Sequence, residues 1–295
     1  MMSIILGVLE EGLVYAIMAL GVYITYRILD FPDLSVDGTF PLGGAITATL
    51  ILAGVNPAAT LFIAFALGVL AGCVTGFIHV KLKVRDLLSG IIVMTALYSV
   101  NLRVAGKANV PFFQNDSIFE NSFVNGLFPE GAADYRVILI LAVIVAAVKL
   151  LLDQYLKTRS GYLLRAVGDN ETLVTSLAKD KGMVKVVGLS IANGLAALAG
   201  SVYCQQKGFF EISMGTGTIV IGLANVIIGT KLFQRIGFVK STTAVIIGSI
   251  IYKGCVSFAI YLGMEASDLR LITSALFLGI LVLSNGREKK VKSHD

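Results

Sequence analysis

Charged residues are scarce in this 295-residue sequence, at 15% of the chain, whereas an average soluble domain has about 25%. Hydrophobic residues make up 56% of the chain, and the mean hydropathy is +0.84. A soluble protein of this composition could not cover its surface with polar groups, so lipid is the expected solvent. The net charge of +5 is distributed as in a membrane protein, so we expect no nucleic-acid partner.

Residues that build metal sites, disulfides and catalytic centres are also few. The three cysteines, Cys73, Cys204 and Cys255, lie inside apolar runs without disulfide or metal spacing, and the two histidines are isolated in the sequence. The sequence contains neither the Gly-x-x-x-x-Gly-Lys-Ser/Thr loop that cradles nucleotide phosphates nor a nucleophile motif. We therefore predict that the chain is not an enzyme and holds no metal and no cofactor.

Long apolar runs fill the chain and predict an all-α integral membrane protein. The runs are continuous rather than alternating, which favours a polytopic helical bundle over a β-barrel. At roughly 20 residues per span, the length allows about nine transmembrane helices, within a range of about 8–10. The predicted spans are residues 7–29, 36–53, 57–80, 87–104, 135–155, 184–205, 215–232, 239–262 and 269–284.

Lys and Arg concentrate on one side of this topology, and they predict its orientation. If the basic tail at residues 287–295 lies in the cytoplasm, most of the 24 Lys and Arg residues also fall inside. The acidic stretches, which include Glu10, Glu11, Asp116 and Glu265, then fall outside. We predict one membrane domain at residues 1–286, with the N-terminus outside and the C-terminus in the cytoplasm. A segment 36–53 that turns back without crossing would reverse the N-terminal side.

A long loop at about residues 105–134 falls on the outside in this topology. It carries Pro111, Phe112 and Phe113 in a stretch of amphipathic character. Two interpretations stay open: a plain surface loop, or a docking surface or short external helix for a partner.

Glycines recur at four-residue spacing in the span at residues 57–80, at Gly68, Gly72 and Gly76. Such a stripe makes a flat helix face that another backbone can approach closely. Packing within the chain is the favoured interpretation, and a subunit interface is the alternative.

A polar stretch at about residues 158–182 separates two predicted spans on the cytoplasmic side. Asp169 or Asn170 could cap a short helix that ends near Lys179. A short helix lying flat on the inner face could engage a protein partner, or it could rest on anionic lipid as an interfacial helix.

The residues of this stretch carry a family resemblance. Its pattern runs from Gly161 through Arg165 and Ala-Val-Gly to Asp169-Asn170, and it continues to Lys181-Gly182 and an Ala/Gly-rich helix. It resembles the coupling segment of the branched-chain amino acid and ribose permease family of ATP-binding cassette (ABC) importers, over roughly residues 7–285. The stretch Asp33-Leu34-Ser35-Val36 also resembles the opening of sugar permeases in that superfamily.

Two departures from the family pattern bear on the substrate. Glu171-Thr172 stands where a proline often follows the asparagine, and Asp37 precedes Gly38 where sugar permeases have glycine directly. The second departure weakens a sugar assignment. The chain looks more like a branch associated with amino acid uptake, with aromatic amino acids as the expected cargo.

The resemblance implies partners and a mechanism. It implies a second permease subunit, as a homodimer in a bacterial inner or plasma membrane, cytoplasmic ABC ATPase subunits and an extracellular or periplasmic substrate-binding protein. ATP hydrolysis would come from the separate ATPase, and the cargo would be a small polar solute. The residues carried over to the ATPase contact are Gly161, Arg165, Gly168, Asn170 and Glu171.

Three carboxylates, Asp30, Asp33 and Asp37, lie within eight residues between two apolar runs, and Pro32 and Gly38 interrupt helix continuity there. Charged groups at membrane depth are costly and mark function, and broken helices can aim backbone groups at a substrate near the midplane. The stretch could therefore line the transport path, or it could be a loop in cytoplasmic water.

A weak internal sequence similarity adds further candidate pathway residues. Glu211-Ile212-Ser213-Met214 follows one span as Asp33-Leu34-Ser35-Val36 follows another, and the two copies face opposite sides in this topology. An inverted-topology repeat has this arrangement, with the path at the repeat interface. The candidate pathway residues are Asp33, Ser35, Thr39, Ser213, Thr216 and Thr218, and the weaker ones are Asn101, Asn193 and Asn225.

One rival class is a stand-alone secondary transporter driven by an ion gradient, for which the cluster of three aspartates could supply ion sites. A membrane-embedded enzyme is disfavoured because no catalytic set is visible in the sequence.

Overall fold

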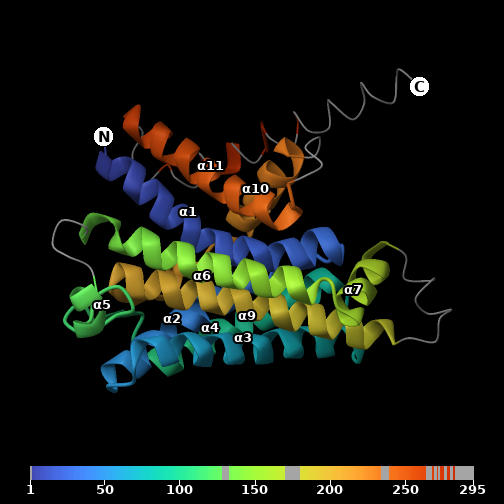
Figure 1. Ribbon diagram of the computed structural model, residues 1–295. Helices are drawn as coiled ribbons and strands as arrows, with labels where there is room; N and C mark the ends of the chain where they lie inside the picture. Colours follow the sequence, from blue (N-terminus) through green and yellow to red (C-terminus); the bar gives the residue numbers. More distant parts are fainter. Residues whose placement is uncertain are drawn as a thin grey trace.

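The computed structural model describes residues 2–127, 133–169, 180–233 and 239–263, together with isolated positions between 268 and 282. The described chain forms a helical bundle with one small two-stranded sheet (Figure 1). Its helices are α1 (Met2–Val22), α2 (Val36–Leu52), α3 (Pro57–Val80), α4 (Asp86–Ala105), α5 (Ser122–Leu127), α6 (Ala133–Tyr155), α7 (Arg159–Asp169), α9 (Lys181–Lys207), α10 (Thr218–Leu232) and α11 (Ser241–Tyr261). A π-helical segment, η1 (Tyr23–Ile28), extends α1, and a 3₁₀ turn, η3 (Ile212–Gly215), precedes α10.

The predicted fold class, an all-α polytopic membrane protein, is confirmed. Within the described residues, seven helical segments are long and apolar enough to cross a membrane, and α2, with 17 residues, is a shorter apolar helix. The predicted span at residues 269–284 and the basic tail at 287–295 lie outside the continuously described chain. A multi-pass protein follows from the described helices alone.

Local chemistry explains where several helices begin and end. Asn56 caps α3, because its side chain accepts a hydrogen bond from the backbone N–H of Ala58, and Pro57 suits the first helical position. Asp180 caps α9 in the same way by accepting from the N–H groups of Gly182 and Met183. Gly208 ends α9 in the left-handed conformation, at φ 73°, which glycine adopts without strain.

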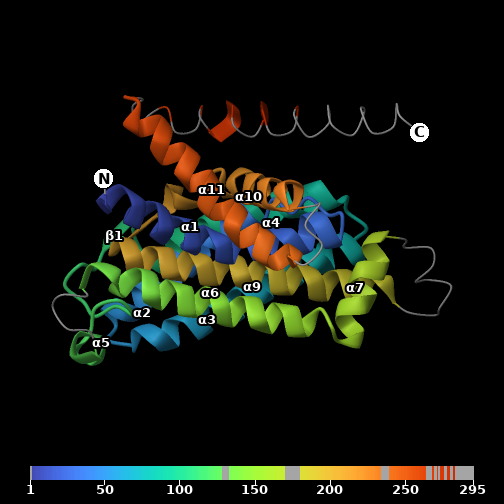
Figure 2. The same ribbon diagram turned by 45° about the horizontal axis from the view of Figure 1, so that its top comes forward.

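The centre of the bundle is made of α1 and α9, which run in opposite directions. Their contacts pair Glu11 with Lys207 near one end and Gly21 with Ala192 further along, so the residue numbers rise on one helix and fall on the other. Residues on all sides of α1, from Leu13 to Val22, are buried. Figure 2 shows α11 crossing the bundle obliquely above α1.

The glycine stripe of α3 faces α9 along its length. A Cβ atom at Gly68 would lie 2.6 Å from the carbonyl oxygen of Asn193, and one at Gly76 would lie 2.8 Å from the Cα of Val186. A Cβ at Gly72 would clash with the carbonyl oxygen of Leu189. The stripe therefore packs two helices of the same chain together, as the favoured interpretation expected.

The loop after α4 is tied to the end of the bundle opposite α7. Strands β1 (Asn109–Pro111) and β2 (Phe209–Glu211) pair antiparallel, with Val110 opposite Phe210. Phe112, Ile118 and Phe119 are buried, and the N–H of Ile118 donates to the side chain of Gln205 at 2.9 Å. The loop also contains a short helix, α5. Of the two interpretations left open by the sequence, the one that included a short helix agrees with the described part of the loop.

Candidate functional site

Two short helices, α2 and α10, begin beside one another inside the bundle. The carboxylate of Asp37, in the first turn of α2, accepts hydrogen bonds from the N–H groups of Gly217 (2.9 Å) and Ile219 (2.7 Å). It also accepts one from the Thr218 hydroxyl at 2.9 Å. The free N–H groups at a helix N-terminus favour a negative charge, so Asp37 stabilises the start of α10.

The backbone before α10 lies directly against α2. A Cβ at Gly215 would clash with the carbonyl oxygen of Asp37 and with the ring of Pro41, so only glycine allows η3 to pass there. After β2, at one end of the bundle, the chain therefore turns back inward before α10 starts. Two helices that start within the membrane, with their N-termini together, are the discontinuous elements that transporters use at substrate sites.

A second group of polar side chains lies just before and along the first turn of α2. The carboxylate of Asp33 accepts from the backbone N–H of Ser35 (2.9 Å), from the Ser35 hydroxyl (2.6 Å) and from Nδ2 of Asn193 (2.7 Å). The amide oxygen of Asn193 in turn accepts from the hydroxyls of Ser35 (3.0 Å) and Thr39 (2.6 Å). All four residues are fully buried. We call Asp33, Ser35, Thr39 and Asn193, together with Asp37 and Thr218, the polar junction.

The three aspartates of this stretch have different surroundings. Asp33 is fully buried and bonded within the chain, so its placement in a water-exposed loop is wrong. Asp37 is partly buried at the start of α10, whereas Asp30 is exposed, with a left-handed backbone at φ 52°. Their proximity in the sequence therefore does not make them one site.

The predicted pathway residues fall into two sets. Asp33, Ser35, Thr39 and Thr218 are buried in the polar junction. Ser213 and Thr216 are exposed in the turn that leads into α10, and the Ser213 hydroxyl donates to the carboxylate of Glu211. The Asp33–Ser35 hydroxyl contact before α2 thus has a local counterpart in the Glu211–Ser213 contact before α10. The inverted repeat itself stays a hypothesis.

Asn193 is the junction residue that the sequence ranked too low. Its only sequence signal is an amide inside an apolar run, which also fits simple helix adhesion. The structure shows that it bonds three side chains from the region of α2. The amide of Asn101, another weak candidate, donates to the carbonyl oxygen of Gly38 at 3.0 Å and so joins α4 to α2.

Helix α7 lies at the other site of interest, at the end of the bundle opposite β1 (Figure 2). Its inner face consists of Gly161, Leu164 and Val167, all buried. A Cβ at Gly168 would clash with the carbonyl oxygen of Ile28, the last residue of η1. Helix α7 is therefore seated closely on the π-helical end of α1.

The residues predicted at an ATPase contact differ in exposure. Gly161 and Gly168 pack against the end of α6 and against η1, whereas Arg165, next to them around the helix, is exposed and lines a cavity together with Tyr162. Asn170 and Glu171 lie outside the described residues. The glycines therefore set how closely α7 is held, and Arg165 is available to a partner.

A cavity of about 340 Å³ opens beside α7, between α6 and α11. Its lining includes Lys157, Arg165 and Lys240. Its one acid, Asp153, accepts hydrogen bonds from Lys149 (3.1 Å), Lys240 (3.0 Å) and the Thr242 hydroxyl (2.7 Å). This end of the bundle is basic, and its cytoplasmic location stays a prediction from the distribution of Lys and Arg. Within the described residues, no group of His, Cys, Asp or Glu side chains is placed to hold a metal.

Comparison with known proteins gives consistent results. Residues 4–284 match the family model described as branched-chain amino acid transport system / permease component. The tyrosine transport system permease protein of Clostridioides difficile is 45% identical over 284 residues, which cover 96% of this chain and 92% of the relative. The ribose import permease protein RbsC of Escherichia coli K12 is 26% identical, covering 96% and 85%.

A more distant relative is the probable branched-chain amino acid transport permease protein LivH of Methanocaldococcus jannaschii. It is 25% identical over 225 residues, which cover 72% of this chain and 70% of the relative. No solved structure gives a significant match.

Proposed function

Because the chain belongs to the family of branched-chain amino acid transport system permease components, we propose that it forms the membrane path of an ABC importer for an amino acid. Membership makes it a multi-pass transport subunit of a system for amino acids or sugars. The observation that supports the ATP-driven part of the proposal is the close packing of α7 against η1. Through this contact, a separate ATPase that binds α7 could move the spans.

The energy source is the first part of the proposal. The chain has no phosphate-binding loop of its own, so ATP must be hydrolysed by a partner on the basic, cytoplasmic end. Arg165 is exposed on α7, and its guanidinium can bind carboxylates of a partner in a fixed, bidentate geometry. Asn170 and Glu171 belong to the same proposed contact.

Movement is transmitted by close packing. Gly168 and Gly161 hold α7 against η1 and α6 without intervening side chains, so a shift of α7 displaces both as one body. From η1 the chain leads within a few residues to Asp33 and the start of α2. Movement at the cytoplasmic end would thus reach the polar junction and change the face to which the path opens.

The path itself is proposed to lie between two copies of this chain. Ser213 and Thr216 are exposed beside the polar junction and can bond a polar solute without the cost of a buried charge. Asp33, Ser35 and Thr39 are bonded to Asn193 on the face of α2 turned to α9, and they hold α2 in place beside this path. Similarity to the tyrosine permease of C. difficile supports an aromatic amino acid as the first cargo to test.

The opposite end is proposed to receive a substrate-binding protein. The paired strands β1 and β2, helix α5 and the buried Phe112 make the loop there a structured surface. A cavity of about 480 Å³, whose lining includes Asn56, Asp116 and Asn121, opens on this surface. A firm, polar surface suits repeated docking of a soluble partner.

The test is reconstitution of the chain in sealed vesicles with an ABC ATPase and a substrate-binding protein, which are to be sought among the neighbouring reading frames. We expect uptake of tyrosine that requires all three proteins and ATP, and ATP hydrolysis that rises when loaded binding protein is added outside. The control is the chain alone under an imposed proton or sodium gradient. Uptake by the chain alone would contradict the proposal and establish the ion-driven alternative.

A further inference from the structure

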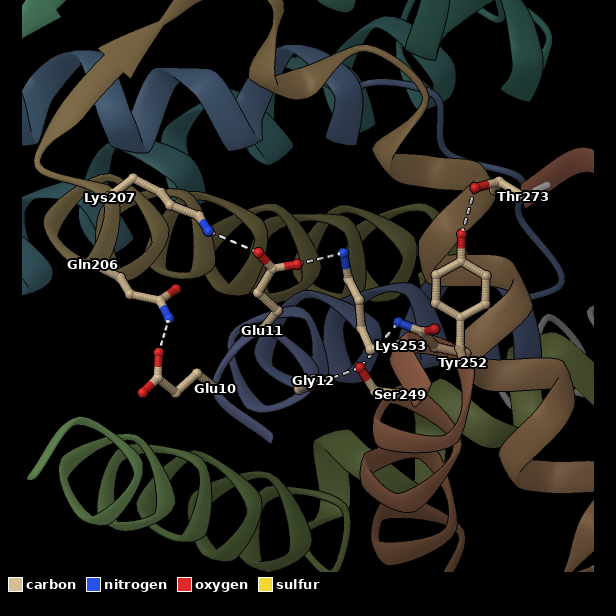
Figure 3. A network of polar contacts seen from close by, with 10 residues as sticks. Glu10, Glu11, Gly12, Gln206, Lys207, Ser249, Tyr252, Lys253 and Thr273 are labelled. Carbon is tan, nitrogen blue, oxygen red and sulfur yellow. Dashed lines mark hydrogen bonds and ion pairs between the residues drawn. The ribbon is translucent and has the colours of Figure 1, made fainter. Parts of the chain in front are cut away.

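Charged side chains join α1, α9 and α11 near one end of the bundle, where Lys207 is the last residue of α9 (Figure 3). The carboxylate of Glu11 accepts from Nζ of Lys207 at 2.7 Å and from Nζ of Lys253 at 2.9 Å. We call these three residues the ionic cluster. Glu11 lies inside the first span, Ile4–Ile28, and Lys253 inside Ser241–Tyr261. Glu10 and Glu11 thus lie within α1 and face neighbouring helices, at the end of the bundle where α9 ends. That this end is the outer one stays a prediction.

Aromatic rings lie beside both lysines. Nζ of Lys253 is 4.3 Å from the ring centroid of Tyr15, and Nζ of Lys207 is 5.6 Å from that of Tyr203. The centroids of the two rings are 5.9 Å apart. An ammonium group over an aromatic face is attracted by the ring quadrupole, so the two tyrosines help to hold both cations at this position.

The ionic cluster is only partly enclosed by the chain. The side chains of Glu11 and Lys207 are 33% and 31% exposed, and that of Lys253 is 13% exposed. Charged groups at membrane depth face a protein interior or a water-filled cavity and avoid lipid. By contrast, α3 exposes large apolar side chains such as Phe62 and Leu70, which suit lipid. The face that carries the ionic cluster is therefore poorly suited to contact with lipid.

Polar groups next to the ionic cluster add acceptors. Nε2 of Gln206 donates to the carboxylate of Glu10 at 2.9 Å. Oε1 of Gln206 is buried and has no hydrogen-bond partner in the described part of the chain. Two carboxylates, two ammonium groups and one unpaired amide oxygen thus lie close together, with no net charge. Such a set matches a ligand that carries one charge of each sign.

We propose that the ionic cluster is a subsite of the transport path that binds the α-carboxylate and α-ammonium groups of an amino acid. The ligand carboxylate takes the place of the Glu11 carboxylate between Lys207 and Lys253. The ligand ammonium pairs with the carboxylate of Glu11 or Glu10 and with Oε1 of Gln206. The two lysines keep a carboxylate between them, the ligand ammonium pairs with a carboxylate of the chain, and no charge is left without a partner. This inference rests on the proposed function and names the chemical groups by which the cargo is held.

The absence of tryptophan from the chain allows a direct binding test. Tyr203→Trp introduces the sole tryptophan beside Lys207, in the full chain held in lipid nanodiscs. We expect a saturable fluorescence change with tyrosine. Tyramine, which lacks the carboxylate, and 4-hydroxyphenylpropanoate, which lacks the ammonium, should bind about tenfold more weakly or worse, as expected when a hydrogen bond between charged groups is lost. Phe258→Trp, on the exposed apolar end of α11, is the matched control and should not respond.

Charge removal supplies the second readout. In the Tyr203→Trp background, Lys253→Met should weaken tyrosine binding by about tenfold or more. If that variant does not fold, Lys207→Gln, at the partly exposed end of α9, takes its place. Equal binding of tyrosine and tyramine, or binding that is unchanged without either lysine, would show that the ionic cluster is only a brace between helices. ATP-driven uptake that persists in such a case would leave the proposed function standing, whereas uptake without any ATPase would refute the function itself.

Discussion

The polar junction and the ionic cluster both hold carboxylates within the helical bundle, but these carboxylates have different hydrogen-bond partners. Asp33 and Asp37 accept hydrogen bonds from neutral donors, namely backbone N–H groups, hydroxyls and the amide of Asn193. Glu11 is held by two ammonium groups and is one-third exposed. Carboxylates fixed by buried neutral donors cannot exchange partners without unfolding part of the chain, whereas an ion pair that reaches water can exchange with a charged ligand. The comparison distinguishes the polar junction, which stabilises the fold, from the ionic cluster, which can bind the transported solute.

The largest expected effect is at the fixed site. Asp33→Ala leaves Nδ2 of Asn193 and the hydroxyl of Ser35 without their carboxylate partner inside the bundle. We expect a loss of about 3–5 kcal/mol in the free energy of unfolding, because buried polar groups lose their partners. Thermal unfolding in detergent measures it, and Asp33→Asn should recover part of the loss. Equal stability of Asp33→Ala and the original chain would show that the junction does not hold the fold.

A smaller effect is expected where α7 meets η1. Gly168→Ala places a Cβ against the carbonyl oxygen of Ile28, so α7 must move away from η1. We expect a cost of about 1–3 kcal/mol from overpacking, together with ATP hydrolysis that no longer drives uptake. Gly126→Ala, where a Cβ meets nothing within 4 Å, is the control. Normal uptake per ATP in Gly168→Ala would remove α7 from the proposed transmission.

The cap on α10 is expected to contribute less again. Asp37→Ala removes the acceptor for the N–H groups of Gly217 and Ile219 and should cost about 0.5–2 kcal/mol. Asp37→Asn keeps an acceptor and loses the charge, so it should retain most of the stability. Chemical unfolding in detergent distinguishes the two variants, and an Asn variant as weak as the Ala variant would show that charge, and not capping, is what α10 needs.

The smallest effect is expected at the exposed lysine that pairs with Asp153 at the basic end. The Lys240 side chain is 58% exposed where it meets Asp153. Lys240→Met should change the free energy of unfolding by less than about 1 kcal/mol, and less still in high salt, because water and ions screen such pairs. Asp153 keeps its bonds from Lys149 and Thr242 in that variant. If Lys240→Met lost as much free energy of unfolding as Asp33→Ala, the distinction between a lysine screened by water and a buried carboxylate would be contradicted.

Much of the fold could be predicted from the sequence because its signals are local. The α3 helix begins and ends at the predicted residues, since Asn56 and Pro57 mark its start and a basic turn follows it. The α9 helix extends the predicted span at both ends, from the Asp180 cap to Gly208. Apolar run length and capping chemistry are enough for elements of this kind.

The sites depended on contacts that no local pattern records. Asp37 meets Gly217 from 180 residues away, and Asn193 meets Asp33 from 160 residues away. An aspartate before a helix looks the same in the sequence whether it caps a distant helix or faces water. Lys253 carried a usable signal, a lone lysine within an apolar run, but its partner Glu11 lies 242 residues earlier. The pairing could be found only once the helices were packed together.

The central claim is that a separate ATPase moves the spans by binding α7. Arg165 tests this claim most directly because it is exposed at the proposed contact. The measurement is the number of tyrosine molecules taken up per ATP hydrolysed, in vesicles that hold the chain, its ATPase and its binding protein. For Arg165→Glu we predict a ratio near zero in a protein as stable as the original, with Lys157→Glu, on the same basic end, as the control. An unchanged ratio in Arg165→Glu would contradict the account.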